Sequence, residues 1–165
     1  HVFLLGTHEL AGDSSNLAGS EYLAFIHQMV IGRPKIDLEA EFKLQKLLVE
    51  LAKDQSINSA HDCSEGGMIV AIAEMAILGG IGVDLDFKMT GRWDAALFGE
   101  NQSLVVITAA PDEIKNTLDT AERFGVPFLE IGIVGGNRFF YSNGIDLSIV
   151  ELTQHYMDGL QTLRS

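Results

Sequence analysis

Hydrophobic and polar positions recur with two different periods along the chain, and these periods predict a mixture of helices and strands. Four leucines between positions 44 and 51 recur at helical spacing, which predicts an amphipathic helix with Asp37 as its N-cap. Residues 68–78 are apolar on nearly every side, as is typical of a buried helix, and Gly79-Gly80 ends it. Three further helices are expected, over residues 20–26 with Ser20 as the cap, over 112–124, and over 147–160.

Short apolar runs rich in β-branched residues predict the strands, and residues 6–19, rich in Gly, Ser, Asn and Asp, predict a loop. The turn Gly135-Gly136-Asn137 predicts a tight hairpin between the last two strands, which would make that pair antiparallel. The expected fold class is therefore α/β (α+β), with helices packed on a mixed, partly antiparallel sheet. The expected strands cover residues 2–5, 57–60, 81–87, 104–108, 128–134 and 138–141.

Length and charge narrow the classes of function. A chain of 165 residues suits a single domain, and 47% hydrophobic residues suffice for a core. The net charge of −12, from 23 acidic and 11 basic residues, argues against nucleic acid or an anionic membrane as a partner. The longest nearly uncharged run, residues 66–83, contains Glu74 and is broken by glycines, so it does not predict a membrane span.

The single cysteine, Cys63, excludes an internal disulfide and a multi-cysteine zinc site, and it fits a reducing, cytoplasmic setting. The chain begins at His1 and its first residues already predict a strand, so we expect it to be one domain of a longer protein.

The segment His61 to Gly67 joins a predicted strand to the buried helix and is the main candidate site. Glycines at a helix N-terminus allow a ligand close to the backbone, where unpaired N–H groups and the helix dipole favour phosphate. In that interpretation Ser64 either caps the helix or donates its hydroxyl to the ligand, and Asp62 acts through water or Mg²⁺. The alternative is a plain helix start whose glycines only permit tight packing.

Two other types of chemistry are open to the same segment. His61 and Asp62 are metal-ligand types, but a metal site needs three or four ligands and no partner histidines stand nearby in sequence. Cys63 with His61 would form a nucleophile pair only if residues two apart could face each other, which neither neighbouring element favours.

A second polar segment, residues 97–103, precedes the strand at 104–108. Glu100 and Gln102 lie there beside a glycine, as in an ordinary solvated turn.

Taken together in chain order, these motifs resemble the C-terminal domain of the phosphoribosylformylglycinamidine synthase family, which belongs to the aminoimidazole ribonucleotide synthase superfamily. The resemblance covers nearly the whole chain. The motifs that carry it are Gly19-Ser20-Glu21-Tyr22-Leu23, His61-Asp62-x-Ser64-x-Gly66-Gly67, Gly79-Gly80, Phe98-Gly99-Glu100-x-Gln102-Ser103 and Ile131-Gly132-x-Val134-Gly135-Gly136.

The resemblance implies a role in an ATP-dependent ligase of purine biosynthesis. That enzyme activates the formamide oxygen of formylglycinamide ribonucleotide with ATP, and ammonia from a glutaminase subunit or domain displaces the phosphate. ATP and Mg²⁺ would be bound mainly by N-terminal domains that precede residues 1–165, so this chain alone is expected to be inactive and to hold neither tightly. The resemblance assigns no catalytic or metal-binding residue to this chain.

By the same resemblance, His61, Asp62, Ser64, Gly66 and Gly67 would bind the substrate phosphate. Glu100 and Gln102 would line the cleft or the contact with the missing domain. That contact surface would be partly apolar, so a dimer of the isolated chain is expected. Two alternatives are a domain of aminoimidazole ribonucleotide synthase or a related ATP-dependent enzyme, and a non-catalytic module that binds a ligand or protein.

Overall fold

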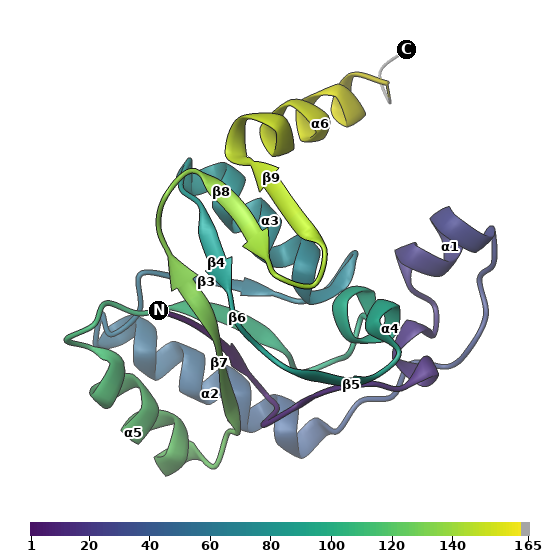
Figure 1. The fold of residues 1–165 in the computed structure, drawn as a ribbon. Helices are drawn as coiled ribbons and strands as arrows, with labels where there is room; N and C mark the ends of the chain where they lie inside the picture. The colour runs from purple at the N-terminus through teal and green to yellow at the C-terminus, as the bar shows by residue number, and fades with distance from the viewer. Residues whose placement is uncertain (163–165) are drawn as a thin grey trace.

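A computed structural model describes residues 1–162 and shows a sheet between helices (Figure 1). Its elements are β1 (Val2–Leu5), β2 (Leu10–Gly12), the 3-10 helix η1 (Ser14–Leu17), α1 (Glu21–His27), α2 (Leu38–Lys53), β3 (Ser59–Asp62), α3 (Gly67–Gly79), β4 (Val83–Leu85), β5 (Met89–Gly91), α4 (Trp93–Phe98), β6 (Val105–Thr108), α5 (Ile114–Phe124), β7 (Phe128–Val134), β8 (Arg138–Tyr141), β9 (Ile145–Ser148) and α6 (Ile149–Thr162).

The main sheet has seven strands in the order β3-β6-β1-β7-β4-β8-β9. Among the described residues its neighbouring strands are antiparallel except β4 and β8, which run parallel. A separate parallel pair, β2 and β5, lies beside it. The predicted class, a mixed and partly antiparallel sheet with packed helices, is confirmed.

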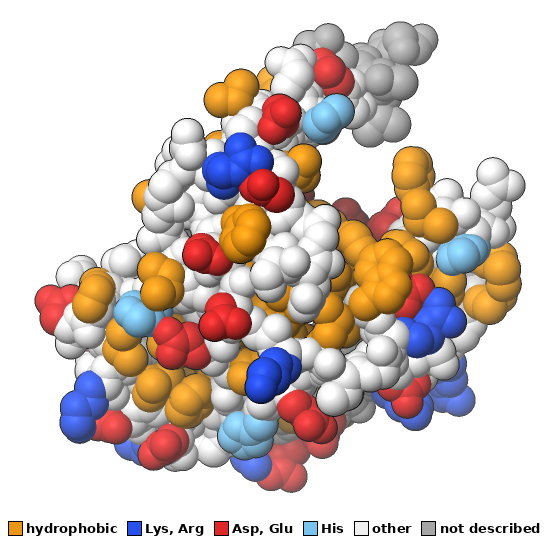
Figure 2. All heavy atoms as spheres, viewed as in Figure 1, with side chains coloured by type: hydrophobic (Ala, Val, Ile, Leu, Met, Phe, Trp, Pro, Cys, Tyr) orange, Lys and Arg blue, Asp and Glu red, His pale blue; other side chains and the backbone are white. Residues whose placement is uncertain are grey.

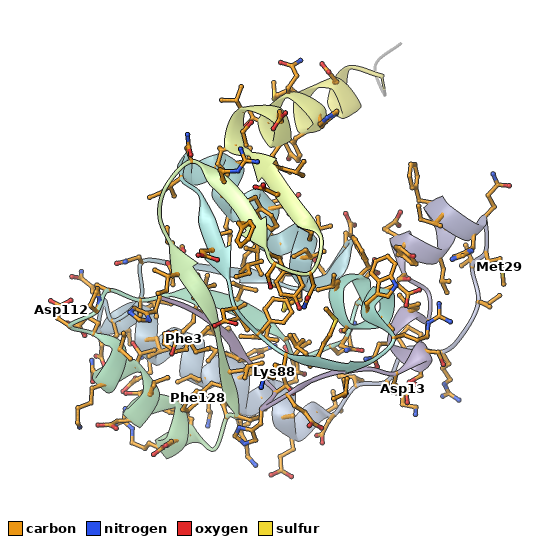
Figure 3. All side chains as sticks on the ribbon, viewed as in Figure 1. Phe3, Asp13, Met29, Lys88, Asp112 and Phe128 are labelled. Carbon is orange, nitrogen blue, oxygen red and sulfur yellow. The ribbon has the colours of Figure 1, made fainter. Side chains whose placement is uncertain are left out.

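Strand β1 lies inside the sheet, between β6 and β7, and is buried on both faces. Phe3 and Leu5 face α2 and α5, where they pack with Leu47 and other leucines of α2, and Phe3 and Phe128 are seen on that side in Figure 3. Val2 and Leu4 point the opposite way, into the cluster that contains the buried side chains of α3. This explains why the strand shows an unbroken apolar run in place of alternation.

The predicted hairpin between β7 and β8 is wrong. Strand β4 lies between them, because Val83 is paired with Val134 on one side and with Phe139 on the other. The glycines of the turn serve this insertion: Gly135 N–H donates to the carbonyl of Gly82 at 2.8 Å. A side chain at position 82 would collide with the backbone of residue 138. The position before β4 therefore requires a glycine if β4 is to lie between β7 and β8.

The C-terminal helix begins two residues later than predicted, at Ile149, because residues 145–148 form strand β9. Its start is a capping box: Glu151 N–H donates to Ser148 Oγ at 3.1 Å, and Ser148 N–H donates to Glu151 Oε2 at 2.9 Å. This Ser-x-x-Glu signal is present in the sequence. It identifies the boundary that the apolar pattern alone misplaced.

Residues 6–19, expected to be a loop, contain the short elements β2 and η1, and β5 and α4 were also not predicted. The cap predicted for α1 is confirmed, since Ser20 Oγ accepts a hydrogen bond from Leu23 N–H at 3.3 Å. Within residues 1–162, no helix combines the length and the apolar character needed to cross a bilayer.

Candidate functional site

The segment between β3 and α3 turns sharply through two glycines in the left-handed region. Gly66 has φ +80° and Gly67 has φ +73°, and Gly67 N–H donates to the carbonyl of Ser64 at 3.1 Å. A β-carbon at position 67 would lie 2.7 Å from the carbonyl carbon of Phe98. The helix start is therefore pressed directly against the backbone at the end of α4, and both positions favour glycine.

Glu100 completes this junction. Its Oε1 accepts a hydrogen bond from Gly66 N–H at 2.9 Å and another from Glu21 N–H, the first residue of α1, at 2.7 Å. One carboxylate oxygen thus holds two segments that are far apart in the sequence. The contact was not foreseen, although Glu100 was already placed beside the cleft by the family resemblance.

Ser64 does not cap α3. The N-cap of this helix is Gly66, which makes no side-chain capping bond, and the Ser64 side chain is exposed. The hydroxyl therefore remains available to a ligand.

Asp62, Ser64 and Gln102, all exposed, line one small cavity of about 160 Å³ beside Ser103. The Ser103 hydroxyl donates to Glu41 Oε2 of α2 at 2.6 Å, and both residues also line the cavity. Three of the predicted site residues are thus brought together, next to the glycine turn.

His61 does not join them. Neighbouring residues on a strand point to opposite faces, and His61 faces α3, where its Nε2 lies 3.1 Å from Glu74 Oε2. Its Nδ1 lies 2.8 Å from the carbonyl oxygen of Asp62. This geometry makes His61 a bridge between β3 and α3.

Cys63 is buried with 2% of its surface exposed. Burial, with a smaller contribution from the charge of Asp62, raises the pKa of its thiol to about 12. A thiol that stays protonated at neutral pH is not an activated nucleophile, so the pairing with His61 is not supported.

No cluster of three His, Cys, Asp or Glu side chains with metal-binding geometry occurs in the described part of the chain. The metal-ligand interpretation of His61 and Asp62 therefore lacks a third ligand here.

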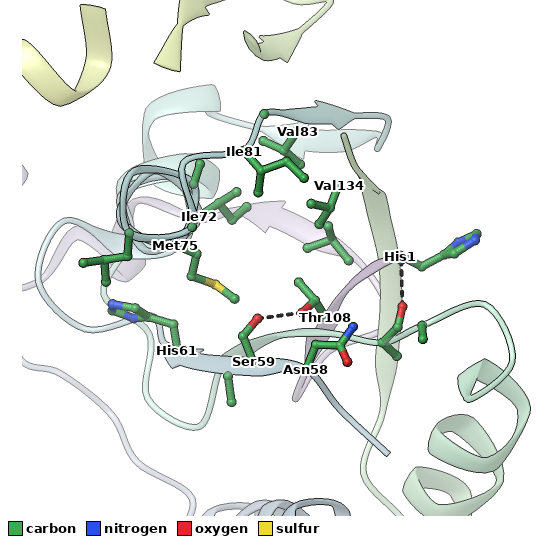
Figure 4. A pocket seen from close by; sticks show the side chains of 18 of the residues that line it. His1, Asn58, Ser59, His61, Ile72, Met75, Ile81, Val83, Thr108 and Val134 are labelled. Carbon is green, nitrogen blue, oxygen red and sulfur yellow. Dashed lines mark hydrogen bonds between the residues drawn. The ribbon is translucent and has the colours of Figure 1, made fainter. Parts of the chain in front are cut away.

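A larger groove of about 620 Å³ lies at the other end of α3 and is mostly apolar (Figure 4). Ile72, Met75 and Ile81 form one wall, and the hydrogen-bonded pair Ser59 and Thr108 stands on the opposite side. Sequence reasoning missed this groove because its walls come from separate strands.

Hydrophobic side chains also gather over α1 and α4 on the face seen in Figure 2. Tyr22 of α1 stacks on Phe98 of α4 with ring centroids 5.0 Å apart. Beyond this stack, α1 and the segment after it, where Met29 is seen in Figure 3, expose large side chains to solvent. We call this surface the outer apolar face, and it comprises Phe25, Ile26, Met29, Val30 and Ile31.

Comparison with known proteins agrees with the motifs. The chain is 40% identical over 164 residues to the phosphoribosylformylglycinamidine synthase subunit PurL of Thermomicrobium roseum, covering 96% of this chain and 22% of that subunit. It is 38% identical over 148 residues to the same subunit of Brucella ovis, covering 89% of this chain and 20% of the subunit. The chain thus spans about a fifth of the length of these curated relatives.

Solved structures show the same fold. Thermotoga maritima PurL complexed with FGAR superimposes with a TM-score of 0.70 at 18% identity, covering 92% of this chain and 27% of that one. Escherichia coli HypE, a hydrogenase maturation protein, gives a TM-score of 0.53 at 17% identity, covering 89% and 48%. Residues 2–142 match the family described as AIR synthase related protein, C-terminal domain, and the chain belongs to that family.

Proposed function

We propose that this chain is the C-terminal domain of a PurL-type phosphoribosylformylglycinamidine synthase, a cytoplasmic ATP-dependent ligase that converts formylglycinamide ribonucleotide to its amidine. The observation that carries the proposal is the 40% identity over 96% of the chain to a PurL subunit. Glutamine, through a glutaminase, supplies the ammonia. ATP and Mg²⁺ are bound mainly by the remaining four fifths of the protein.

Within that enzyme, the segment from Asp62 to Gly67 binds the phosphate of the ribonucleotide. The proposal is supported by the glycine turn at the start of a 13-residue helix and by the exposed hydroxyl of Ser64 beside it. His61 supports the segment from behind through Glu74. Gln102 shares the adjoining cavity with Asp62 and Ser64.

The outer apolar face contacts the rest of the protein in this proposal. Phe25 and Val30 are 84% and 81% exposed, which is unfavourable for two large apolar side chains so close in sequence unless another surface covers them. Glu100 contacts the base of this face, because it accepts a hydrogen bond from the first residue of α1.

A chimera tests the assignment. The matching segment of Thermomicrobium roseum PurL is replaced by this chain, and ATP-dependent amidine formation from formylglycinamide ribonucleotide is measured with ammonia as the nitrogen source. We expect activity in the chimera and none in a subunit that lacks the segment or in the 165-residue chain alone. A chimera that folds and binds ATP but forms no amidine would contradict the proposal.

A domain of aminoimidazole ribonucleotide synthase is the second candidate, since the family model matched by residues 2–142 is named for that enzyme. The same chimera separates the two, because only a domain of the proposed ligase restores amidine formation.

A further inference from the structure

We infer that the solvent-facing side of α2 is a docking surface for an acidic amphipathic helix of a separate protein. This surface, which we call the α2 stripe, comprises Leu38, Phe42, Gln45, Lys46, Val49 and Lys53. The surface goes beyond the proposed function, and only the choice of a separate protein rests on that function.

The first step in the argument is that α2 carries apolar residues on two opposite sides. Because successive helical residues are turned by about 100°, the α2 stripe occupies one side of roughly 100° of arc, and the buried leucines of α2 occupy the opposite side. Leu38, Phe42 and Val49 of the stripe are 74%, 58% and 55% exposed. The solvent side of a surface helix is normally polar, so this row favours contact with another surface.

The second step is that the α2 stripe borders a groove. Helices α2 and α5 pack side by side on one face of the sheet (Figure 1). Between them, Phe42 and Val49 of α2 and Phe124 of α5 line a hollow of about 410 Å³. Two helices with an apolar hollow between them can receive the apolar side chains of a third helix, which is a common mode of recognition.

The third step concerns charge, which selects the partner. The α2 stripe contains two lysines and no carboxylate, although the whole chain carries a net charge of −12. Lys46 Nζ lies 4.2 Å from the centre of the Phe42 ring, and Lys53 forms no ion pair within residues 1–162. Glu50, the one carboxylate that lines the described groove, lies 3.7 Å from Arg123 Nη2. A helix with carboxylates beside its apolar row therefore complements this surface.

Other occupants fit less well. Two copies of the chain related by a twofold axis would present the same patch to each other, which brings lysines together with no carboxylate in either α2 stripe. Nucleic acid and anionic membranes are disfavoured by the net charge of −12. The rest of the longer protein is already assigned to the outer apolar face by the proposed function. A separate protein is therefore the occupant of the α2 stripe.

The experiment measures the binding of a synthetic helical peptide to the 165-residue chain by fluorescence anisotropy. The probe has about 16 residues, enough to span α2, with one row of leucines and glutamates on both flanks. The matched probe keeps the leucines and has lysine in place of every glutamate. We expect the acidic peptide to bind about tenfold more tightly than the basic one, and salt to reduce the difference. Equal affinities would overturn the inference.

Variants of the chain locate the binding surface. Phe42→Ala and Lys46→Glu should each weaken binding of the acidic peptide about tenfold, because the first removes an apolar anchor and the second reverses an attracting charge. The matched controls are Phe25→Ala, on the outer apolar face, and Lys88→Glu, an exposed lysine between β4 and β5. They should change the affinity less than about twofold. Equal losses in variants and controls would overturn the inference. Circular dichroism confirms that each variant is folded.

Two further measurements identify the source of the partner. The acidic peptide should bind the chimera with Thermomicrobium roseum PurL as tightly as it binds the isolated chain. Loss of binding in the chimera would show that the rest of the subunit covers the α2 stripe, and it would overturn the assignment to a separate protein. Vesicles that contain phosphatidylserine should not bind the chain, and vesicle binding that Lys46→Glu abolishes would overturn the inference in favour of a membrane.

The readouts separate this inference from the proposed function, because none of them measures amidine formation. A chimera that binds the acidic peptide but forms no amidine contradicts the proposed function alone. An active chimera whose isolated domain binds both peptides equally contradicts the docking surface alone.

Discussion

Helices α1 and α2 follow one another in the chain and are both rich in apolar residues, yet they lie in opposite environments. The apolar side of α2 is closed: Leu44, Leu47 and Leu51 are each at most 2% exposed against the sheet. No residue of α1 is buried, and Phe25 is 84% exposed. The comparison shows that this chain covers one apolar surface by itself and leaves another exposed, and the predictions below test that difference.

The largest effect is expected on the closed side. Leu47 is fully buried, so Leu47→Ala should lower the free energy of unfolding by about 3 kcal/mol, since it removes packing and leaves a cavity. Val49 lies on the same helix but is 55% exposed, so Val49→Ala should cost less than about 0.5 kcal/mol. Urea denaturation of both variants measures the contrast, and equal losses would contradict the assigned orientation of α2.

The next largest loss of stability is expected at the glycine turn before α3. Gly67→Ala combines a left-handed φ of +73° with a collision against the backbone at Phe98, so we expect a loss of about 2 kcal/mol. Gly80 has φ +61° and nothing within 4 Å of the position of a β-carbon. Gly80→Ala should therefore cost only the conformational strain, about 1 kcal/mol. Thermal or urea unfolding that ranks Gly80→Ala as the worse variant would refute the crowding at position 67.

On the open side, substitutions should change association and leave stability alone. We expect the isolated chain to dimerise through the outer apolar face. The double substitution Phe25→Asp and Val30→Asp should raise the dimer dissociation constant more than about tenfold, because it places charge where apolar surface would be buried. The free energy of unfolding should shift by less than about 0.5 kcal/mol. Light scattering across a concentration series gives the measurement, and a wild-type chain that is monomeric throughout would disprove the expectation.

The last effect is a pH dependence from the closed interior, and it is the smallest at neutral pH because it develops only in alkali. The pKa of Cys63 is raised from 9.0 to about 12 in the folded chain, so the neutral thiol is the form that the fold favours. Its contribution is fully present below pH 9, where the unfolded thiol is also neutral, and is lost as the pH rises from about 9 to about 12. Stability measured across that range should fall less steeply in Cys63→Ser. An identical slope in both proteins would show that other groups cause the fall.

Local sequence patterns were sufficient to predict the helices that pack against the sheet through one face. The leucine spacing located α2 because one row of side chains meets the sheet. The pairing of β4 could not be read in the same way. Its place between β7 and β8 depends on contacts between residues about 50 positions apart, and the glycines at 135 and 136 suit an ordinary hairpin equally well.

The candidate site was predicted in part for a similar reason. The glycines at 66 and 67 signal a helix start that tolerates close approach, and the structure shows both in the left-handed region. The bond from Glu100 to Gly66 spans 34 positions, and no local rule relates them. His61 was grouped with Asp62 by adjacency, and its Nδ1 does lie 3.7 Å from Asp62 Oδ1, but its ring faces α3 and lines a different pocket from Asp62.

The interior position of β1 has a consequence for the order of events during synthesis. This strand precedes both of its neighbours in the chain: β6 emerges about 100 residues later and β7 about 120 residues later. At the usual speed of translation, the wait for β6 lasts on the order of ten seconds. Until then, this fully buried strand has no neighbouring strand to pair with. Residues 2–5 therefore need shelter until residues 105–108 have left the ribosome.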